Sequence, residues 1–411
     1  MVFTETTPLP SLRYDLEFFE VMPGIIAMYD GQGFSDVTMQ LPVDVIDYLL
    51  YMDGHRTVLE FAGHAARAGK PFDADKFLEV VETLEEEGFL DTPGYAARLE
   101  QLEKDYNGLT VRPATYAGTC YPDDPDELRE LLDEYLENPG LAPDSPAPVG
   151  VFVPHIDPRV GGHIYGPAYN ALRKSDADTF VILGVPHYMN YDRFMFSRMD
   201  FDTPLGVLPT DTEFIERFRE KLSFDLTEDE IAHRQEHSIE FQAIFLRHVF
   251  PDRDIRIVPV LTSALFEYVE SGEGNADADN FLTELYETLA ETGKELGRKV
   301  AWVASVDFCH IGKKFGDSFP AAEKLEEIRE HDEKLIEQMI RPDAEGFLQR
   351  LVDVRNRFRV CGTSPMYAFL RSVQPARGTL LGYDQWDETE QESAVSFASL
   401  AFYTDSGRLP A

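Results

Sequence analysis

The sequence predicts an α/β domain, a three-layer sandwich around a mostly parallel sheet, preceded by a small α+β domain. At 411 residues the chain is too long for one core, and we expect one boundary, giving domains of residues 1–105 and 106–411. Beyond this boundary, apolar runs rich in Val and Ile alternate with helical patterns. Such runs suit strands of a parallel sheet with helices on both faces. They are Val149–Pro154, Thr179–Val185, Ile255–Thr262 and Val300–Val306.

Helical patterns separate these four runs, as an α/β sandwich requires. Two later runs, Thr379–Tyr383 and Ala394–Tyr403, have the composition of strands. We expect both to extend the sheet and the second to be antiparallel. The intervening helices are predicted at Gly166–Lys174, Thr212–Lys221, Ser238–Phe250, Asp279–Gly293 and Pro320–Ile340.

The first hundred residues predict a separate, winged-helix-like domain. Two short strands surround a Pro23-Gly24 turn, and three helical patterns follow. The run Tyr51–Glu60 (YMDGHRTVLE) resembles the PqqD-like peptide-binding domains, which implies capture of a peptide or protein partner. DNA binding is the rival function for this shape, but the third helix, Asp73–Glu87, is rich in Glu. Phosphate contacts need Lys and Arg, so this rival is disfavoured.

The charge of the chain excludes two classes of partner. Asp and Glu number 75 against 37 Lys and Arg, a net charge of −38, which repels nucleic acid and anionic membranes. No basic segment followed by an apolar run opens the sequence, and no apolar stretch of about 20 residues occurs. The three cysteines do not form a secreted disulfide framework. We therefore expect a cytoplasmic protein with reduced thiols.

Three of the four core strands end in a potential metal ligand. His155, His187 and Cys309 follow the first, second and fourth strands. In open α/β sheets, ligands bind at the carboxyl ends of the strands, where residues distant in sequence converge. Each residue alone also has an ordinary interpretation, a hydrogen-bonded His or a small buried Cys. Their shared position predicts one metal-ready pocket.

A fourth element, Gln235–Glu240 (QEHSIE), opens the predicted helix Ser238–Phe250. Spacing places a carboxylate and the imidazole of His237 on one helical face. A capping cluster is the alternative, because Glu is favourable at a helix N-terminus. We take His237 as a proton shuttle or a ligand, since imidazole titrates near physiological pH.

Seven short blocks, together and in this order, resemble the Memo family, which includes AmmeMemoRadiSam system protein B. The resemblance covers about Val111 to Tyr403. Any one block alone would be a weak signal, whereas seven in order are specific. The blocks are Ala117–Pro122 (AGTCYP), Val153–His155 (VPH), Ile182–His187 (ILGVPH), Glu236–Glu240 (EHSIE), Ile257–Val260 (IVPV), Ser305–His310 (SVDFCH) and Cys361–Gly362 (CG).

This resemblance implies a fold similar to that of class III extradiol dioxygenases, which hold Fe(II) with two histidines and a carboxylate. Memo-like proteins present two histidines and a cysteine instead, which we assign to His155, His187 and Cys309. Such a set could take Fe(II), our first choice, or Cu or Zn. The resemblance implies redox chemistry, in which His237 moves protons and Asp307 orients a ligand from outside the coordination sphere. Glu236 completes the predicted catalytic group.

The leading hypothesis is an iron-dependent, dioxygenase-like oxidoreductase acting on a small molecule or peptide. The resemblance also implies partners, a radical SAM protein and an AMMECR-type protein, with the N-terminal domain recruiting a peptide or partner. Two alternatives stay open: a non-catalytic metal or redox adaptor and a zinc-dependent hydrolase.

Overall fold

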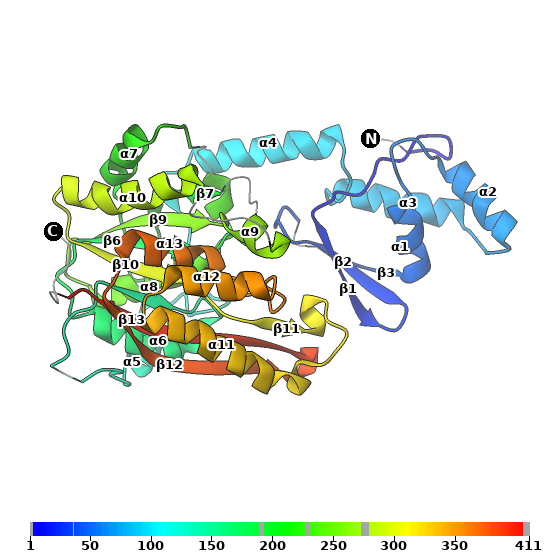
Figure 1. Ribbon diagram of the computed structural model, residues 1–411. Coiled ribbons are helices and arrows are strands. Elements are labelled where there is room, and N and C mark those ends of the chain that lie inside the picture. Colours follow the sequence, from blue (N-terminus) through cyan, green and yellow to red (C-terminus); the bar gives the residue numbers. More distant parts are fainter. Residues whose placement is uncertain are drawn as a thin grey trace. The chain divides into compact units, whose positions relative to one another are not determined.

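The chain forms two compact units, Met1–Gly108 and Leu109–Ala411, in the computed structural model (Figure 1). The structure describes residues 3–35, 37–142, 144–188, 193–226, 230–272 and 279–405. Within these ranges, no helix is both long and apolar enough to cross a membrane.

The N-terminal unit is a three-stranded antiparallel sheet followed by helices. Its first two strands form the predicted hairpin, and Gly24 in the connecting turn has a φ of +82°, which favours glycine. Met28, Leu49 and Val81 are fully buried in its core. The winged-helix resemblance of this unit stays a prediction. The elements are β1 (Leu16–Met22), β2 (Ile25–Asp30), β3 (Thr38–Pro42), α1 (Val43–Leu50), α2 (Val58–Ala68), α3 (Ala74–Glu86) and α4 (Pro93–Asn107).

The C-terminal unit contains an eight-stranded mixed sheet, which confirms the predicted α/β class. The strand order is β11-β13-β5-β10-β6-β9-β7, with β12 on β13. The four central strands β5, β10, β6 and β9 are parallel, and the other described pairings of this sheet are antiparallel. The strands are β5 (Gly150–Val153), β6 (Thr179–Gly184), β7 (Phe194–Phe196), β9 (Arg256–Thr262), β10 (Val300–Ser305), β11 (His310–Gly312), β12 (Arg377–Glu388) and β13 (Ser393–Tyr403).

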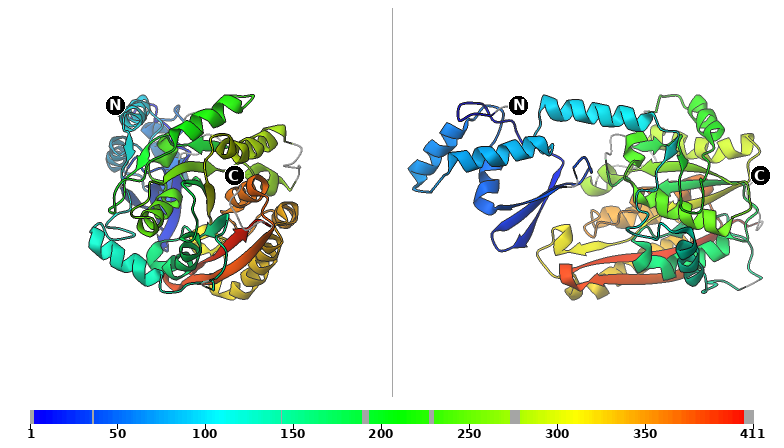
Figure 2. Two further views of the ribbon diagram at one scale, coloured as in Figure 1. Left: turned by 90° about the vertical axis from the view of Figure 1, so that its left-hand side faces the viewer. Right: turned by 180° about the vertical axis from the view of Figure 1, so that it is seen from behind.

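Alternate side chains of the central strands enter two different cores, one on each face of the sheet. In β5, Val151 and Val153 pack with helices α5, α6 and α8, whereas Phe152 packs on the opposite face. That opposite core includes side chains of α7, α10, α11, α12 and α13 (Figures 1 and 2). Burial of both strand faces explains the uninterrupted apolar runs. The helices are α5 (Pro125–Tyr135), α6 (Pro158–Leu172), α7 (Thr212–Lys221), α8 (His237–Val249), α9 (Phe266–Ser271), α10 (Asn280–Glu295), α11 (Leu325–Ile340), α12 (Ala344–Asp353) and α13 (Thr363–Val373).

A crossing connection after β10 shapes the functional end of the sheet. The chain leaves β10 at Ser305 and next pairs, as β11, with the far side of β13. Because β5 and β13 lie between β10 and β11, residues 306–309 pass over the carboxyl end of β5. The amide of Val306 donates to the carbonyl of Val153, and the amide of Phe308 donates to that of Ser396. Successive residues of this segment therefore lie above different strands.

Candidate functional site

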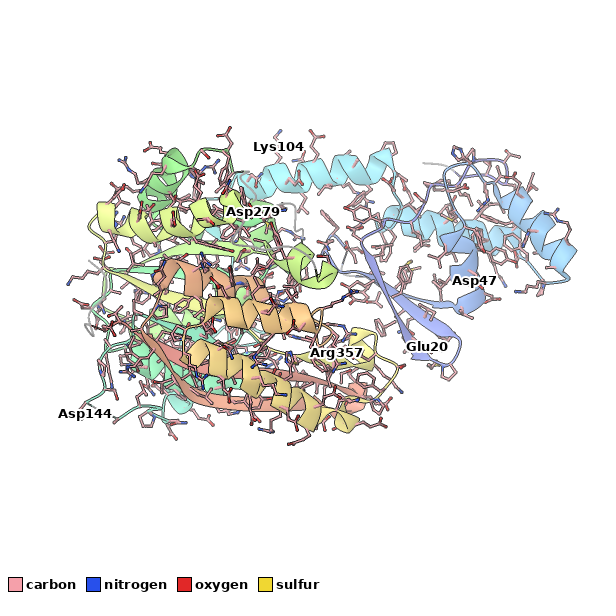
Figure 3. The ribbon with its side chains drawn as sticks, viewed as in Figure 1. Glu20, Asp47, Lys104, Asp144, Asp279 and Arg357 are labelled. Carbon is pink, nitrogen blue, oxygen red and sulfur yellow. The ribbon has the colours of Figure 1, made fainter. Side chains whose placement is uncertain are left out.

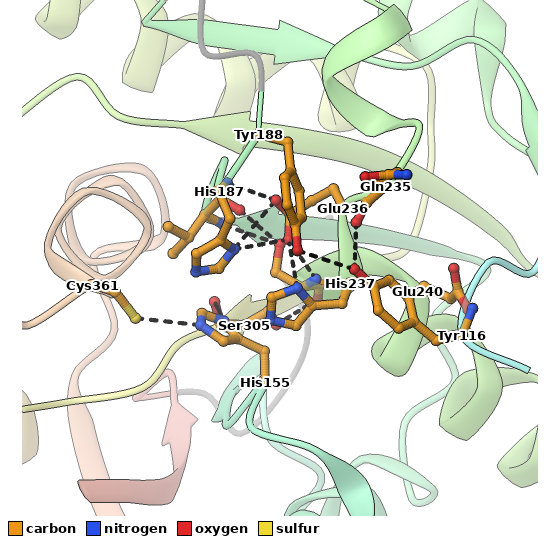
Figure 4. A network of polar contacts seen from close by, with 12 residues as sticks. Tyr116, His155, His187, Tyr188, Gln235, Glu236, His237, Glu240, Ser305 and Cys361 are labelled. Atoms are coloured by element: carbon orange, nitrogen blue, oxygen red, sulfur yellow. Dashed lines mark hydrogen bonds and ion pairs between the residues drawn. The ribbon is translucent and has the colours of Figure 1, made fainter. Parts of the chain in front are cut away.

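Three histidines from three separate segments meet at the carboxyl end of the parallel strands (Figure 4). His155 follows β5, His187 follows β6, and His237 is the first residue of α8. One ring nitrogen of each lies within 4.8 Å of the others. The ring centroids of His187 and His237 are 4.6 Å apart, and that of His155 is 5.1 and 5.4 Å from them. Convergence of the two strand-end histidines matches the expectation from the sequence.

His155 is held in one orientation by the chain that crosses above β5. Its Nδ1 lies 3.0 Å from the carbonyl of Ser305, which can only accept, so Nδ1 carries the proton and Nε2 presents a lone pair. The backbone amide of His155 donates to Oδ1 of Asp307 at 3.0 Å. Burial lowers the pKa of His155 to about 3, so the imidazole stays neutral. A neutral imidazole with a directed lone pair is the form that binds a metal.

His187 is oriented in the same way, by a carboxylate. Its Nδ1 lies 3.1 Å from Oε1 of Glu236, and its amide donates to Oε2 at 2.7 Å. Burial lowers the pKa of His187, but the charge and hydrogen bond of Glu236 raise it more, so the net shift is upward. Glu236 also caps α8, accepting from the amide of Ser238 at 2.8 Å. The side chain of His187 is 28% exposed, which opens this side of the cluster to solvent.

A buried ion pair between Arg112 and Glu240 supports the first turn of α8, where His237 lies. One turn along α8, Glu240 is fully buried and accepts from the guanidinium of Arg112, which is also fully buried. Arg112 donates in addition to the carbonyls of His233 at 2.6 Å and Glu236 at 2.8 Å. These bonds fix the start of α8 beneath the cluster. Burial, followed by the nearby His187, lowers the pKa of His237 well below its ordinary value, which keeps this ring neutral as well.

A close approach between β6 and α8 brings His187 and His237 together. A Cβ atom on Gly184, the last residue of β6, would lie 2.6 Å from Oγ of Ser238. Ser238 donates to the carbonyl of Val185 at 3.0 Å. The glycine therefore lets the N-terminus of α8 reach the end of the strand.

The structure corrects the predicted position of Cys309. Its sulfur lies not with His155 and His187 but in a second cluster, 3.0 Å from Oδ1 of Asp332. The physical reason is the crossing connection: Asp307 lies above β5, but two residues later the amide of Cys309 already bonds Oγ of Ser396 on β13, at 2.9 Å. Position after a strand end does not reveal such a sideways turn.

The cysteine beside the histidines is Cys361, in the loop before α13 (Figure 4). Its sulfur lies 3.3 Å from Nε2 of His155. The amide of Gly362 donates to the carbonyl of Asp307 at 3.2 Å, which ties this loop to the crossing segment. Burial raises the pKa of the Cys361 thiol well above its ordinary value. The available signal in the sequence was the Cys361–Gly362 block, which precedes a helix that begins at Thr363.

The other predicted catalytic residues surround the histidines. Asp307 is buried, and Oδ2 lies 3.6 Å from Nε2 of His155. Burial raises its pKa to about 6, against the opposing effect of His310. Glu236 is 1% exposed, and although burial raises its pKa, His187 lowers it well below the usual range. The cluster therefore combines an ionised carboxylate with one that can take a proton near neutral pH.

The donors suit a divalent transition metal. His155 and His187 each direct Nε2 away from an acceptor at Nδ1, and Cys361 adds a thiol. Two imidazoles and a sulfur match Fe, Cu or Zn better than Mg or Ca, which prefer oxygen. Hydrogen-bond partners on the far ring nitrogens are typical of metal-ligating histidines. His237 is a fourth nitrogen donor within reach of the first two.

Comparison with known proteins supports the resemblance seen in the sequence blocks. The sequence profile described as Memo-like protein matches residues 112–401. A "MEMO1 family protein" of Aquifex aeolicus is 28% identical over 401 residues, covering 95% of this chain and all of the relative. One of Methanosarcina barkeri is 30% identical over 295 residues, covering 71% of this chain and 99% of the relative. One of Thermus thermophilus is 26% identical over 324 residues, covering 78% and 91%. With the histidine cluster inside the matched region, the chain belongs to the Memo family.

Proposed function

We propose that this protein is a metal-dependent, dioxygenase-like oxidoreductase whose ion is held by His155, His187 and Cys361. The observation that carries the proposal is the pair of oriented Nε2 atoms, with the Cys361 sulfur 3.3 Å from one of them. Fe(II) is the favoured ion, because two histidines and one anionic ligand leave positions open in non-haem iron sites. When bound, such an ion supplies a centre for electron transfer to oxygen or substrate. Cu and Zn are the alternative ions.

The residues around the proposed ion orient its ligands and transfer or hold protons. Glu236 holds His187 at Nδ1, and the carbonyl of Ser305 holds His155, so both rings face the centre. His237 is neutral and 22% exposed, which suits a group that passes a proton between substrate and solvent. Asp307 anchors the backbone of His155 and can hold a proton itself, since its pKa is about 6.

A non-catalytic metal or redox adaptor is the second candidate. The donor beside His155 is the thiol of Cys361 where ring-cleaving enzymes have a carboxylate. A thiolate is softer and can itself be oxidised, which favours binding of metal or response to oxidants over ring cleavage.

Metal analysis of protein purified without added metal tests the ligand set. We expect iron in the wild type and in Cys309→Ala, and loss of iron in Cys361→Ala and His187→Ala. Iron retained in Cys361→Ala would overturn the ligand set. Zinc in place of iron would direct attention to the hydrolase alternative. Oxygen consumption with catechol-type compounds then separates enzyme from adaptor, because the adaptor binds iron without consuming oxygen.

We further propose that the N-terminal unit recruits a peptide or protein partner, in a system with radical SAM and AMMECR-type proteins. A hollow of about 400 Å³ lies against α1 and α2, lined by residues that include Tyr48, Tyr51 and Phe61. Tyr51 is 63% exposed, so its side chain is available for contact. Replacing Tyr51 with Asp should weaken capture of such partners and leave the iron content unchanged. Equal capture by both proteins would remove this role.

A further inference from the structure

We propose that Cys309, His331 and Asp332 form a second metal site, one that takes Zn(II) and joins α11 to the crossing segment between β10 and β11. The three residues offer one sulfur, one nitrogen and one oxygen within 4.8 Å of one another. None of them belongs to the histidine cluster, so the inference does not depend on the function proposed above.

The spacing of the three donor atoms fits a tetrahedral ion. Sγ of Cys309 lies 3.0 Å from Oδ1 of Asp332 and 3.6 Å from Nδ1 of His331. Nδ1 of His331 lies 3.6 Å from the same Oδ1. Zinc bonds of about 2.3 Å to sulfur and 2.0–2.2 Å to nitrogen and oxygen give a tetrahedron with edges of roughly 3.3–3.6 Å. Small adjustments of the side chains would therefore place all three around one ion.

The buried carboxylate of Asp332 has no full positive charge beside it among the described residues. Asp332 is fully buried, and His331 is its only ion-pair partner in the described parts of the chain. Tyr383 donates to Oδ2 at 2.9 Å and the thiol of Cys309 donates to Oδ1 at 3.0 Å, so both oxygens are hydrogen-bonded, but neither donor brings a positive charge. A buried carboxylate is normally paired with a cation or a metal. Zn(II) with a thiolate and a carboxylate is neutral in total, which removes the imbalance.

The imidazole of His331 supplies an independent indication. Among the residues that the structure describes, Nε2 has no hydrogen-bond partner, and the polar atoms that Nδ1 contacts are the sulfur of Cys309 and the carboxylate of Asp332, each at 3.6 Å. The ring is 11% exposed and lines a solvent-open hollow of about 380 Å³, together with Glu330 and Arg357, the latter labelled in Figure 3. An ion could reach the buried thiol past this ring. A largely buried imidazole aimed at a thiol and a carboxylate is more consistent with a ligand than with a packing residue.

Binding requires one chemical change in the protein. The proton of the Cys309 thiol leaves to solvent as the Zn–S bond forms, and no oxidant or reductant is involved. Mixed sulfur, nitrogen and oxygen donors in a tetrahedral arrangement favour Zn(II) among the common ions. With Tyr383 on β12 holding Asp332, the site would connect α11, the crossing segment and the edge of the sheet.

The test uses the full chain with the first site disabled, His155→Ala with Cys361→Ala, so that failure of either proposal is visible separately. Metal-free protein is titrated with zinc against a chromophoric chelator and, in parallel, with Co(II). We expect one zinc ion to bind and a near-ultraviolet cobalt–thiolate band to appear. Adding His331→Asn should weaken zinc binding by more than about 100-fold, beyond the effect of losing a mere supporting contact.

Two further variants make the result decisive. Cys309→Ser should abolish the cobalt–thiolate band. If this variant fails to fold, His331→Asn, at the rim of the hollow, provides the test, and circular dichroism checks that it is folded. Glu330→Gln is the matched control, because Glu330 precedes His331 and lines the same hollow but is not a proposed ligand. Zinc affinity unchanged by His331→Asn, or lowered equally by Glu330→Gln, would overturn the site. Absence of zinc binding in the disabled background would overturn it too.

Discussion

The C-terminal unit holds two groups of cysteine and histidine that differ in charge and in access to solvent. At the ends of β5 and β6, the histidine cluster contains the neutral imidazoles of His155 and His237 beside His187, and the side chains of His187 and His237 are 28% and 22% exposed. Beside the middle of α11, the Cys309 cluster contains a carboxylate and a thiol that are both fully buried. The first group is open to solvent, and its ionised carboxylate, Glu236, is bonded to His187, whereas in the second group a fully buried carboxylate is itself one of the three potential ligands.

This difference predicts different uses for a bound ion. Sites that exchange ligands or perform chemistry keep a position open, whereas structural sites enclose the ion with protein donors. In the histidine cluster the orienting groups, Glu236 and the carbonyl of Ser305, contact the far ring nitrogens and leave the facing side free. In the Cys309 cluster the acidic group is itself a donor. We therefore expect the first to bind substrate and the second to bind only an ion.

The largest effect should follow from breaking the ion pair beneath the histidine cluster. Replacing Arg112 with Met leaves Glu240 buried without its cation, at a cost of about 3–5 kcal/mol in the free energy of unfolding. The start of α8 should loosen, so metal binding at the histidine cluster should weaken while zinc at Cys309 is retained. Urea unfolding and metal titration measure the two effects.

An exposed ion pair provides the control for this variant. Arg129 and Asp126 pair at 2.6 Å but have side chains 50% and 88% exposed. Arg129→Met should change the free energy of unfolding by less than about 1 kcal/mol. If Arg112→Met is no worse than Arg129→Met, the ion pair does not support the cluster, and the start of α8 is held by other contacts.

Glu236 offers a narrower way to separate the two groups. The variant Glu236→Gln keeps one carbonyl oxygen that can accept from Nδ1 of His187 but removes the negative charge of the carboxylate. Metal affinity at the histidine cluster should fall by about 10- to 100-fold, as for other supporting residues of metal sites. Zinc affinity at Cys309, measured by competition with a chelator, should stay constant. A parallel fall at both sites would show that they are not independent.

Acid should weaken the metal-free protein through its buried neutral histidines. Burial lowers the pKa of His155 to about 3 and that of His233 to about 4, against about 6.5 in an unfolded chain. Below pH 6.5 the unfolded state binds more protons than the folded state, so stability present above this pH is lost as the pH falls. Each histidine should contribute about 1.4 kcal/mol per pH unit between about 6.5 and its folded pKa.

Urea midpoints at pH 7, 6 and 5, in the presence of a chelator, check this prediction. His187 and Asp307 act with the opposite sign, because their folded pKa values are raised and their contributions are lost as the pH rises through those values. The histidines with lowered pKa outnumber these two groups, so the net effect below pH 6.5 is loss of stability. Equal stability at pH 7 and pH 5 would contradict the burial assigned to these rings.

The sequence predicted the centre of the sheet and the meeting of two histidines at its carboxyl end, while their role as ligands stays a prediction. Runs such as Thr179–Val185 correspond closely to β6 (Thr179–Gly184), since burial on both faces leaves an uninterrupted apolar signal. His155 and His187 were predictable because parallel strands bring their carboxyl ends to one edge. The antiparallel edges were harder to predict, because nothing in the composition of β11 or β7 states which strand it joins.

The cysteines show the limit of the same reasoning. Cys309 follows a strand just as His155 does, but the chain turns sideways over β5 before reaching it, which hydrophobic patterns do not record. Cys361 lies in the loop before α13 and Asp332 lies within α11, and neither a single thiol nor a single carboxylate in such a segment has a distinctive spacing. Contacts between distant segments, and not local pattern, decide which sulfur joins which cluster.

The smallest predicted effect tests the support of the Cys309 cluster. Tyr383 donates to Oδ2 of Asp332 at 2.9 Å and accepts from Gln385 at 2.8 Å, and Tyr383→Phe removes both bonds. The metal-free protein should lose about 1–2 kcal/mol of unfolding free energy, at about 1 kcal/mol for each typical hydrogen bond. Zinc affinity should fall by about 10-fold, because Asp332 loses the contact that orients it.

Tyr286→Phe is the matched control, since the buried hydroxyl of Tyr286 has no hydrogen-bond partner in the described part of the chain and its removal should cost nothing. The comparison between the clusters then becomes quantitative. If Tyr383→Phe alters stability but not zinc affinity, Asp332 belongs to a hydrogen-bond network and not to a metal site. If both change while iron at the histidine cluster is unaffected, the two clusters bind their ions separately, and the closed one holds the sheet edge against α11.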